Sequence, residues 1–223
     1  MSTAPLAGVL LAIGLGGAAL LATRLLLAYI ARREPEEPGA TLPPVGGAAL
    51  AVAVAVAALL LFWNRPLTAV VAVQAGWAAA LAVIFTVDLR VRYILDIWTA
   101  PLALLAVLAA IALPHPAYLS LRSALTGGAI GLVLFAAFYG LGLLVFHQAA
   151  LGLGDVKLAA LMGLMVGTER ILTAVFIGVC LGGVASLFLV ALRRAKLGDA
   201  PAYGTYLTLG GYAALLGAAG LWH

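Results

Sequence analysis

Charged residues and cysteine are scarce in this sequence. Asp, Glu, Lys and Arg make up 9% of the 223 residues, whereas hydrophobic residues make up 65%. Soluble domains carry about 25% charged residues, so this composition excludes a soluble globular fold. The single cysteine, Cys180, excludes an intrachain disulfide and a multi-cysteine zinc site. The net charge of +4 does not predict nucleic-acid binding, because most Lys and Arg residues flank apolar segments and act there as topology signals.

Long apolar runs fill most of the chain. About 20 apolar residues in a helix cross a hydrocarbon core of about 30 Å, so we expect an all-α, polytopic integral membrane protein with about eight helices. The expected ranges are 5–31, 46–63, 67–87, 98–114, 124–147, 155–167, 171–192 and 203–221. The sixth is too short to cross alone, and we expect it to pack against protein.

The loop charges predict an orientation, because cytoplasmic loops accumulate Lys and Arg. With both termini outside, the inner loops hold eight basic residues: Arg32, Arg33, Arg90, Arg92, Lys157, Arg193, Arg194 and Lys196. The outer loops hold three: Arg65, Arg122 and Arg170. This sorting favours an even number of spans with both termini outside. Asp88, Asp96 and Asp155 then lie at the cytoplasmic face.

Two aspartates stand out, because an ionisable group at the centre of a membrane helix costs about 2.5–3.5 kcal/mol on insertion scales. Asp88 directly follows the apolar run 81–87, and we expect it in a loop after the third helix. Asp155 lies in Gly152-Leu-Gly154-Asp155-Val-Lys157, where two glycines are expected to allow a sharp turn into a helix. Considered alone, Asp155 would be interpreted as an ordinary helix N-cap. Considered alone, Asp88 would be interpreted as an ion-pair partner of Arg90 or Arg92.

Taken together, the two aspartates form the constellation that acid proteolysis needs. Two carboxylates held close together do not both ionise easily, so the pair shares one proton. The ionised member deprotonates a water while the protonated member polarises the scissile carbonyl. We therefore predict Asp88 and Asp155 as a catalytic pair.

Three segments in order along the chain resemble the type IV prepilin peptidase family, whose members are aspartyl proteases of the membrane. The segment Asp88-Leu-Arg90-Val-Arg92-Tyr-Ile-Leu-Asp96-Ile-Trp-Thr-Ala-Pro resembles the first aspartate motif, and Gly152-Leu-Gly154-Asp155-Val-Lys157 the second. Pro201-Ala-Tyr203-Gly204-Thr205 resembles the segment before the last helix. The resemblance implies that Asp88 and Asp155 are catalytic. It also implies cleavage of leader peptides from type IV prepilins or pseudopilins at the cytoplasmic face of a bacterial or archaeal inner membrane.

The sequence departs from the family pattern in two ways. Leu95 and Thr205 stand where the family has proline. We expect these two changes to alter the geometry of the loops and to leave the two aspartates in place. Bifunctional members carry two Cys-x-x-Cys pairs in an N-terminal cytoplasmic loop, associated with zinc and with N-methylation of the product, and this chain has neither pair. We expect proteolysis without a cofactor, no metal, and S-adenosylmethionine only where methylation is retained.

Supporting roles are expected for neighbours of the pair. Asp96 is expected to cap the fourth helix or to contact the basic residues of the leader. Lys157 is expected to orient Asp155 or to extend toward lipid headgroups. Tyr203 and Gly204 are expected to shape the rim of the site. Residues 1–223 are interpreted as one membrane-embedded peptidase domain: N-terminal helices in 1–66 with a short cytoplasmic loop at 32–45, then a catalytic core in 67–223.

Two other functions fit parts of the pattern. Presenilin-like peptidases also use Gly-x-Gly-Asp, but their Pro-Ala-Leu segment is absent. A small proton- or cation-coupled transporter could use the same aspartates at a broken helix. Such a transporter is expected to hold its carboxylates at mid-membrane, whereas Asp88 and Asp155 are predicted near one interface.

Overall fold

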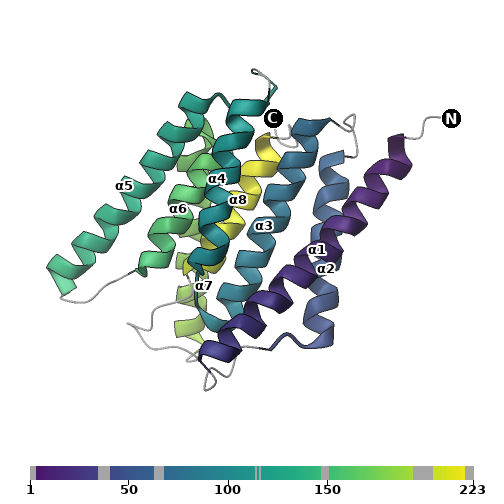
Figure 1. The fold of residues 1–223 in the computed structure, drawn as a ribbon. Coiled ribbons are helices and arrows are strands. Elements are labelled where there is room, and N and C mark those ends of the chain that lie inside the picture. The colour runs from purple at the N-terminus through teal and green to yellow at the C-terminus, as the bar shows by residue number, and fades with distance from the viewer. Residues whose placement is uncertain are drawn as a thin grey trace. The chain divides into compact units, whose positions relative to one another are not determined.

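The chain is all-helical in its described part. The computed structural model describes residues 4–34, 41–62, 68–113, 115, 117–146, 151–192 and 203–218. These residues form eight helices and no strand (Figure 1). The helices are α1 (Ala4–Arg33), α2 (Pro44–Phe62), α3 (Ala69–Val91), α4 (Asp96–Ala112), α5 (Leu121–Phe146), α6 (Leu153–Val166), α7 (Thr168–Ala191) and α8 (Tyr203–Ala218). The predicted all-α class and the predicted order of eight helices are confirmed.

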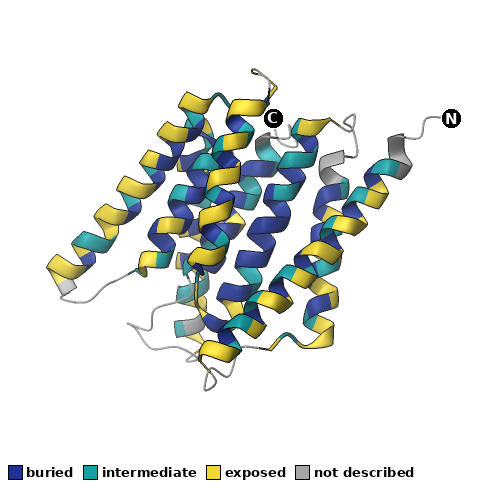
Figure 2. Ribbon diagram, in the orientation of Figure 1, coloured by how far each residue is buried: buried dark blue, intermediate teal, exposed yellow. Residues whose placement is uncertain are grey.

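The surface of these helices is apolar, as in a protein surrounded by lipid. Four described segments are long and apolar enough to cross a membrane: Ala7–Arg33, Ala69–Val91, Leu121–Val145 and Thr168–Phe188. Large apolar side chains such as Leu10, Leu144 and Leu187 are more than half exposed, and exposed residues recur along α1 and α5 (Figure 2). Because water would penalise such exposure, the chain is a polytopic membrane protein.

The chain divides into two compact units, Met1–Tyr93 and Ile94–His223. The division falls after α3. The sequence instead predicts the boundary between the N-terminal helices and the expected catalytic core at residue 66. In the first unit α1, α2 and α3 pack on one another. A Cβ atom added at Gly16 of α1 would lie 2.6 Å from the carbonyl oxygen of Ala51 in α2. The missing side chain therefore lets these two backbones touch, as small residues do between membrane helices.

The short helix α6 is the centre of the second unit. It has 14 residues and packs against α4, α5, α7 and α8, as expected for a helix too short to cross alone. Among its fully buried side chains are Leu158, Leu161 and Met162. At Gly167 the backbone takes a φ of 77°, and α7 begins at the next residue. Glycine adopts this left-handed conformation without a steric cost, so a single residue reverses the chain.

Glycines bring α5 and α6 into backbone contact. A Cβ atom at Gly131 would lie 2.2 Å from the carbonyl oxygen of Ala159, and one at Gly163 would lie 2.1 Å from that of Gly127. Carbon atoms cannot approach an oxygen so closely, so these positions admit no side chain. The helices lie side by side in Figure 1, and this contact joins α5 to the middle of α6.

We predict that Gly131→Ala forces α5 away from α6 and lowers the free energy of unfolding by about 1–3 kcal/mol, as overpacking does. Gly140→Ala is the matched control, because a Cβ atom at that position of the same helix meets nothing within 4 Å. Thermal unfolding in detergent, followed by circular dichroism, measures both variants. Equal unfolding midpoints for the two variants would contradict the close contact.

Candidate active site

Asp88 lies inside a helix, which corrects the expectation of a loop. Helix α3 continues three residues past Asp88 to Val91 and ends at Arg92, whose φ of 52° is left-handed. The Arg92 amide donates a hydrogen bond to the Asp88 carbonyl oxygen at 2.8 Å, which closes the last turn. Leu and Arg are good helix formers, so the end of the apolar run at Val87 did not end the helix. The Asp88 side chain is buried, with 4% of the residue exposed.

Asp155 lies in the first turn of α6. The helix begins at Leu153 with Gly152 as its N-cap, so Asp155 is the third helical residue and not the N-cap itself. The Gly152 amide donates a hydrogen bond of 3.1 Å to Asp155 Oδ2, and the Asp155 amide donates one to the Gly152 carbonyl oxygen. A carboxylate in the first turn satisfies an otherwise unpaired amide and lies near the positive end of the helix dipole. Asp155 is buried, with 8% of the residue exposed.

The two glycines before Asp155 have different roles, and neither supplies a left-handed turn. Gly152 has φ −76° and ψ 150°, a conformation open to any residue, and a Cβ atom there would only touch Asp155 Oδ2 at 3.5 Å. At Gly154 a Cβ atom would lie 3.0 Å from the Cβ of Ile94. The second glycine is therefore needed for close packing of Ile94, which corrects the expectation of conformational freedom at both positions.

Asp96 and Lys157 form an ion pair. Lys157 Nζ lies 2.7 Å from each carboxylate oxygen of Asp96, so the lysine bridges the first turns of α6 and α4. Asp96 is the first residue of α4, and its N-cap is Leu95, so the expected capping role is wrong. Both side chains are at least half exposed, so the pair contributes little to stability.

Arg90 ties the end of α3 to the segment before α2. Its Nη2 atom donates a hydrogen bond of 2.7 Å to the carbonyl oxygen of Thr41. Arg92 is exposed and forms the left-handed end of α3. Asp88, Arg90 and Arg92 therefore belong to the first unit. The second unit brings together the Gly152–Asp155 turn, Lys157 and Asp96.

Tyr203 and Gly204 are the first two residues of α8. Tyr203 lines a cavity together with Leu151, the residue before Gly152. Pro201 of the third motif, the loop residues 35–40 and the basic residues Arg65, Arg193, Arg194 and Lys196 lie outside the described residues.

Sequence reasoning missed three contacts, those of Ile94 with Gly154, of Arg90 with Thr41 and of Lys157 with Asp96. Ile94 looks like any apolar residue in the sequence. Thr41 accepts the hydrogen bond through its backbone, so its side chain gave no signal.

Burial separates the two predicted catalytic aspartates from the other acidic residues that the structure describes. Glu34, Asp96 and Glu169 are exposed, whereas Asp88 and Asp155 are buried. Burying a carboxyl group is costly unless it is hydrogen-bonded, so a buried carboxyl group in a membrane protein is a candidate functional residue. A buried carboxyl group in the end turn of a helix suits acid–base chemistry on water.

The chain resembles known proteins over the region that holds both aspartates. The sequence pattern of the type IV leader peptidase family matches residues 75–187. A prepilin leader peptidase/N-methyltransferase of Stutzerimonas stutzeri is 29% identical over 99 residues, which cover 44% of this chain and 34% of the relative. A Pseudomonas putida protein of the same name has the same identity and coverage.

A type 4 prepilin-like proteins leader peptide-processing enzyme of Escherichia coli is 28% identical over 149 residues, which cover 64% of this chain and 53% of the relative. The matches thus span about a third to a half of the length of these relatives. No solved structure shows a significant match. Because the family pattern covers half of the sequence and includes Asp88 and Asp155, the chain belongs to the type IV leader peptidase family.

Proposed function

We propose that this chain is an aspartic endopeptidase of the membrane that removes leader peptides from type IV prepilins or pseudopilins. The observation that carries the proposal is the burial of Asp88 and Asp155, in contrast to the exposed acidic residues Glu34, Asp96 and Glu169. Both aspartates fall within the 75–187 match to the leader peptidase family. The names of the relatives support prepilins as the substrate class.

The connection between the two aspartate motifs supports their pairing. Five residues separate Asp88 from Ile94, and the six Cα-to-Cα steps of such a link span at most about 20 Å when fully extended. Helix α3 includes the first three of these residues, which shortens the reach. Ile94 packs on Gly154, the residue before Asp155. We propose that this short tether keeps Asp88 within reach of Asp155.

The helix ends suggest a role for each carboxyl group. Asp155 accepts a hydrogen bond from the Gly152 amide at a helix N-terminus, where negative charge is stabilised. Asp88 lies in the last turn of α3, where the dipole disfavours negative charge. We therefore assign the ionised role to Asp155 and the protonated role to Asp88.

In the proposed reaction, Asp155 removes a proton from water, and the oxygen of the water attacks the scissile carbonyl carbon. Asp88 donates its proton to the carbonyl oxygen. When the tetrahedral intermediate collapses, Asp155 gives its proton to the leaving nitrogen, the C–N bond breaks, and Asp88 takes back a hydroxyl proton as the carboxyl product forms. The two carboxyl groups then share one proton again, as they did at the start.

The proposal includes an orientation and a compartment. With both termini outside, the two aspartate motifs face the cytoplasm, where a basic leader is accessible, and the membrane is the cytoplasmic membrane of a bacterium or archaeon. Hydrolysis by two carboxyl groups needs no cofactor. S-adenosylmethionine enters only where the product is also N-methylated. Such methylation would proceed here without the two Cys-x-x-Cys pairs, because Cys180 is the single cysteine.

We predict that Asp88→Asn and Asp155→Asn each reduce cleavage of a prepilin at least about a thousandfold, because each removes one half of the acid–base pair. Glu169→Gln, which removes an exposed carboxylate from the same membrane domain, is expected to keep wild-type activity. Mass spectrometry of the prepilin after incubation with purified protein measures cleavage, and the mass of the product reports any added methyl group. Full activity of either Asn variant would refute the pair, whereas no cleavage of any prepilin by the folded wild-type protein would favour a carboxylate-dependent transporter.

We also predict that the two glycines of the second motif differ in how well they tolerate substitution by alanine. Gly154→Ala displaces Ile94 and is expected to lower kcat/KM at least tenfold, because misplacing a catalytic group slightly is costly. Gly152→Ala is expected to change kcat/KM less than threefold, since its Cβ atom fits at ordinary contact distance and its backbone needs no glycine. The same cleavage assay measures both. The reverse order of sensitivity would contradict the packing of Ile94 on Gly154.

A further inference from the structure

An arginine lies in the apolar, exposed surface of the first unit. Arg24 is an exposed residue of α1, and the side chains around it, Leu21 and Leu25, are 59% and 62% exposed. Arg24 lies nine helical steps before Arg33, so it is about 14 Å from the end of α1. A cation among lipid-facing leucines is costly unless an anion pairs with it. The position of Arg24 therefore calls for a negatively charged group at the lipid-facing surface.

Two guanidinium groups flank the start of α2. A Cβ atom added at Gly47, in the first turn of α2, would lie 3.9 Å from Arg24 Nη2, so the Arg24 side chain lies beside this turn. On α3, Arg90 donates a hydrogen bond of 2.7 Å to the carbonyl oxygen of Thr41, three residues before α2 begins. Residues 41–47 span at most about 15 Å, so both guanidinium groups border one small area of the surface. We call Arg24 and Arg90 the arginine pair.

Positive charge exceeds negative charge in the described part of the first unit. Its basic residues are Arg24, Arg32, Arg33, Arg90 and Arg92, and its acidic residues are the exposed Glu34 and the buried Asp88. Within the ranges 4–34, 41–62 and 68–93, neither member of the arginine pair forms an ion pair with a carboxylate. A guanidinium group has five N–H donors, so Arg90 keeps donors for an anion beside its bond to Thr41.

The surface of α1 next to Arg24 has room for a hydrocarbon chain. Gly17 lies two turns before Arg24 on the same face of the helix, and it is exposed. A Cβ atom at Gly17 would meet nothing within 4 Å, so the helix backbone is bare there. Leu21 lies between the two positions along the helix and is itself exposed. A charged group at Arg24 can therefore continue into a chain that lies on an apolar helix surface.

We infer that the arginine pair binds the headgroup phosphate of an anionic phospholipid, whose acyl chains lie on the apolar surface around Gly17 and Leu21. A guanidinium group binds phosphate oxygens through two parallel N–H donors, which makes arginine suited to this anion. The ligand is a lipid because Arg24 lies among exposed leucines, and it is anionic because the surface around it is positive. This inference does not depend on the proposed peptidase function.

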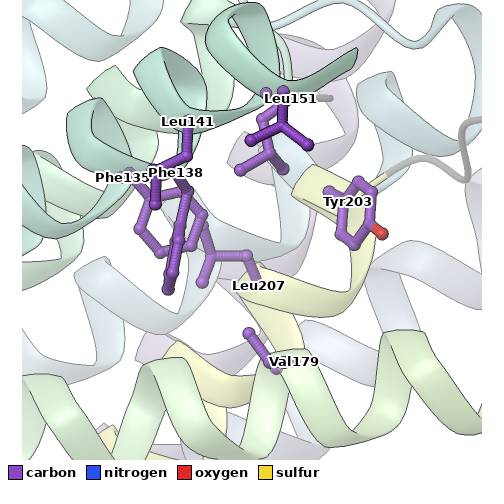
Figure 3. Close-up of a pocket in the computed structure, with 10 residues that line it drawn as sticks. Phe135, Phe138, Leu141, Leu151, Val179, Tyr203 and Leu207 are labelled. Carbon is purple, nitrogen blue, oxygen red and sulfur yellow. The ribbon is translucent and has the colours of Figure 1, made fainter. Parts of the chain in front are cut away.

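The second unit offers a different place for lipid. An apolar cavity of about 440 Å³ lies among α5, α7 and α8, with Phe135, Val179 and Leu207 in its lining (Figure 3). No charged side chain is among its described lining residues. A lipid chain held there is not selected by the charge of its headgroup. A preference for an anionic headgroup therefore separates the arginine pair from this cavity.

Lipid retention tests the arginine pair. Purified protein in neutral detergent receives equal amounts of phosphatidylglycerol and zwitterionic phosphatidylcholine, and native mass spectrometry counts the lipids that stay bound. The wild type is expected to retain at least about tenfold more phosphatidylglycerol than phosphatidylcholine. Arg24→Gln and Arg90→Gln should each lower phosphatidylglycerol retention about tenfold, because each removes charge-assisted hydrogen bonds to phosphate. Arg122→Gln, at an exposed arginine of α5 in the second unit, is the matched control and should retain it like the wild type.

A photocrosslinking measurement on the wild type covers the case in which a variant does not fold. Phosphatidylglycerol with a diazirine in its acyl chain is bound and irradiated, and mass spectrometry of the digested protein locates the modified residues. Modified residues on α1 or α2 support the inference.

Equal retention of the two lipids by the wild type would overturn the inference. Neutralisation of the arginine pair by Glu36 and Glu37 of the adjoining segment predicts this result. Undiminished phosphatidylglycerol retention in Arg24→Gln, or crosslinks confined to the cavity of the second unit, would overturn it as well. Displacement of the lipid by an equal concentration of inorganic phosphate would identify a site for a soluble anion and exclude a lipid site.

Discussion

The proposed site depends on one close contact, at Gly154. Gly154 lies against Ile94, and even a methyl group there would press on the Ile94 Cβ. Ile94 follows the end of α3, which carries Asp88, and Gly154 precedes Asp155. One contact thus links the two motifs through the chain itself. The Lys157–Asp96 ion pair adds a second link beside it, at atoms that are far more exposed to solvent.

The N-terminal end of α6 explains how a lipid-embedded protein tolerates a buried carboxyl group at Asp155. A carboxyl group in the middle of an apolar span has few donors to bind, since the backbone amides are already paired. The first turn of α6 has an unpaired amide at Gly152, and Asp155 takes it. Making α6 short and surrounding it with four helices brings this helix end into the protein interior. The glycine contacts of α5 with α6 make that burial possible.

The sequence predicted the features that lipid enforces and missed those that depend on tertiary contacts. Apolar length located all eight helices, because backbone groups in lipid must be paired within helices. The cost of ionisable groups near apolar spans singled out Asp88 and Asp155. The end of α3 was misjudged, because the apolar run ends at Val87 while the helix continues to Val91. Lys157 was assigned to Asp155 or to headgroups, because nothing local reveals a partner 61 residues away at Asp96.

The pairing of Asp88 with Asp155 is the central claim, and a double-cysteine bridge tests it most directly. In a Cys180→Ala background, Asp88→Cys with Asp155→Cys is treated in the membrane with copper phenanthroline or a one-carbon bismethanethiosulfonate. A disulfide requires Cα atoms within about 7 Å. We predict an intramolecular bridge for this pair and none for Ile84→Cys with Asp155→Cys, one turn earlier on α3. No bridge at positions 88 and 155, with both thiols still reactive toward a small maleimide, would contradict the account.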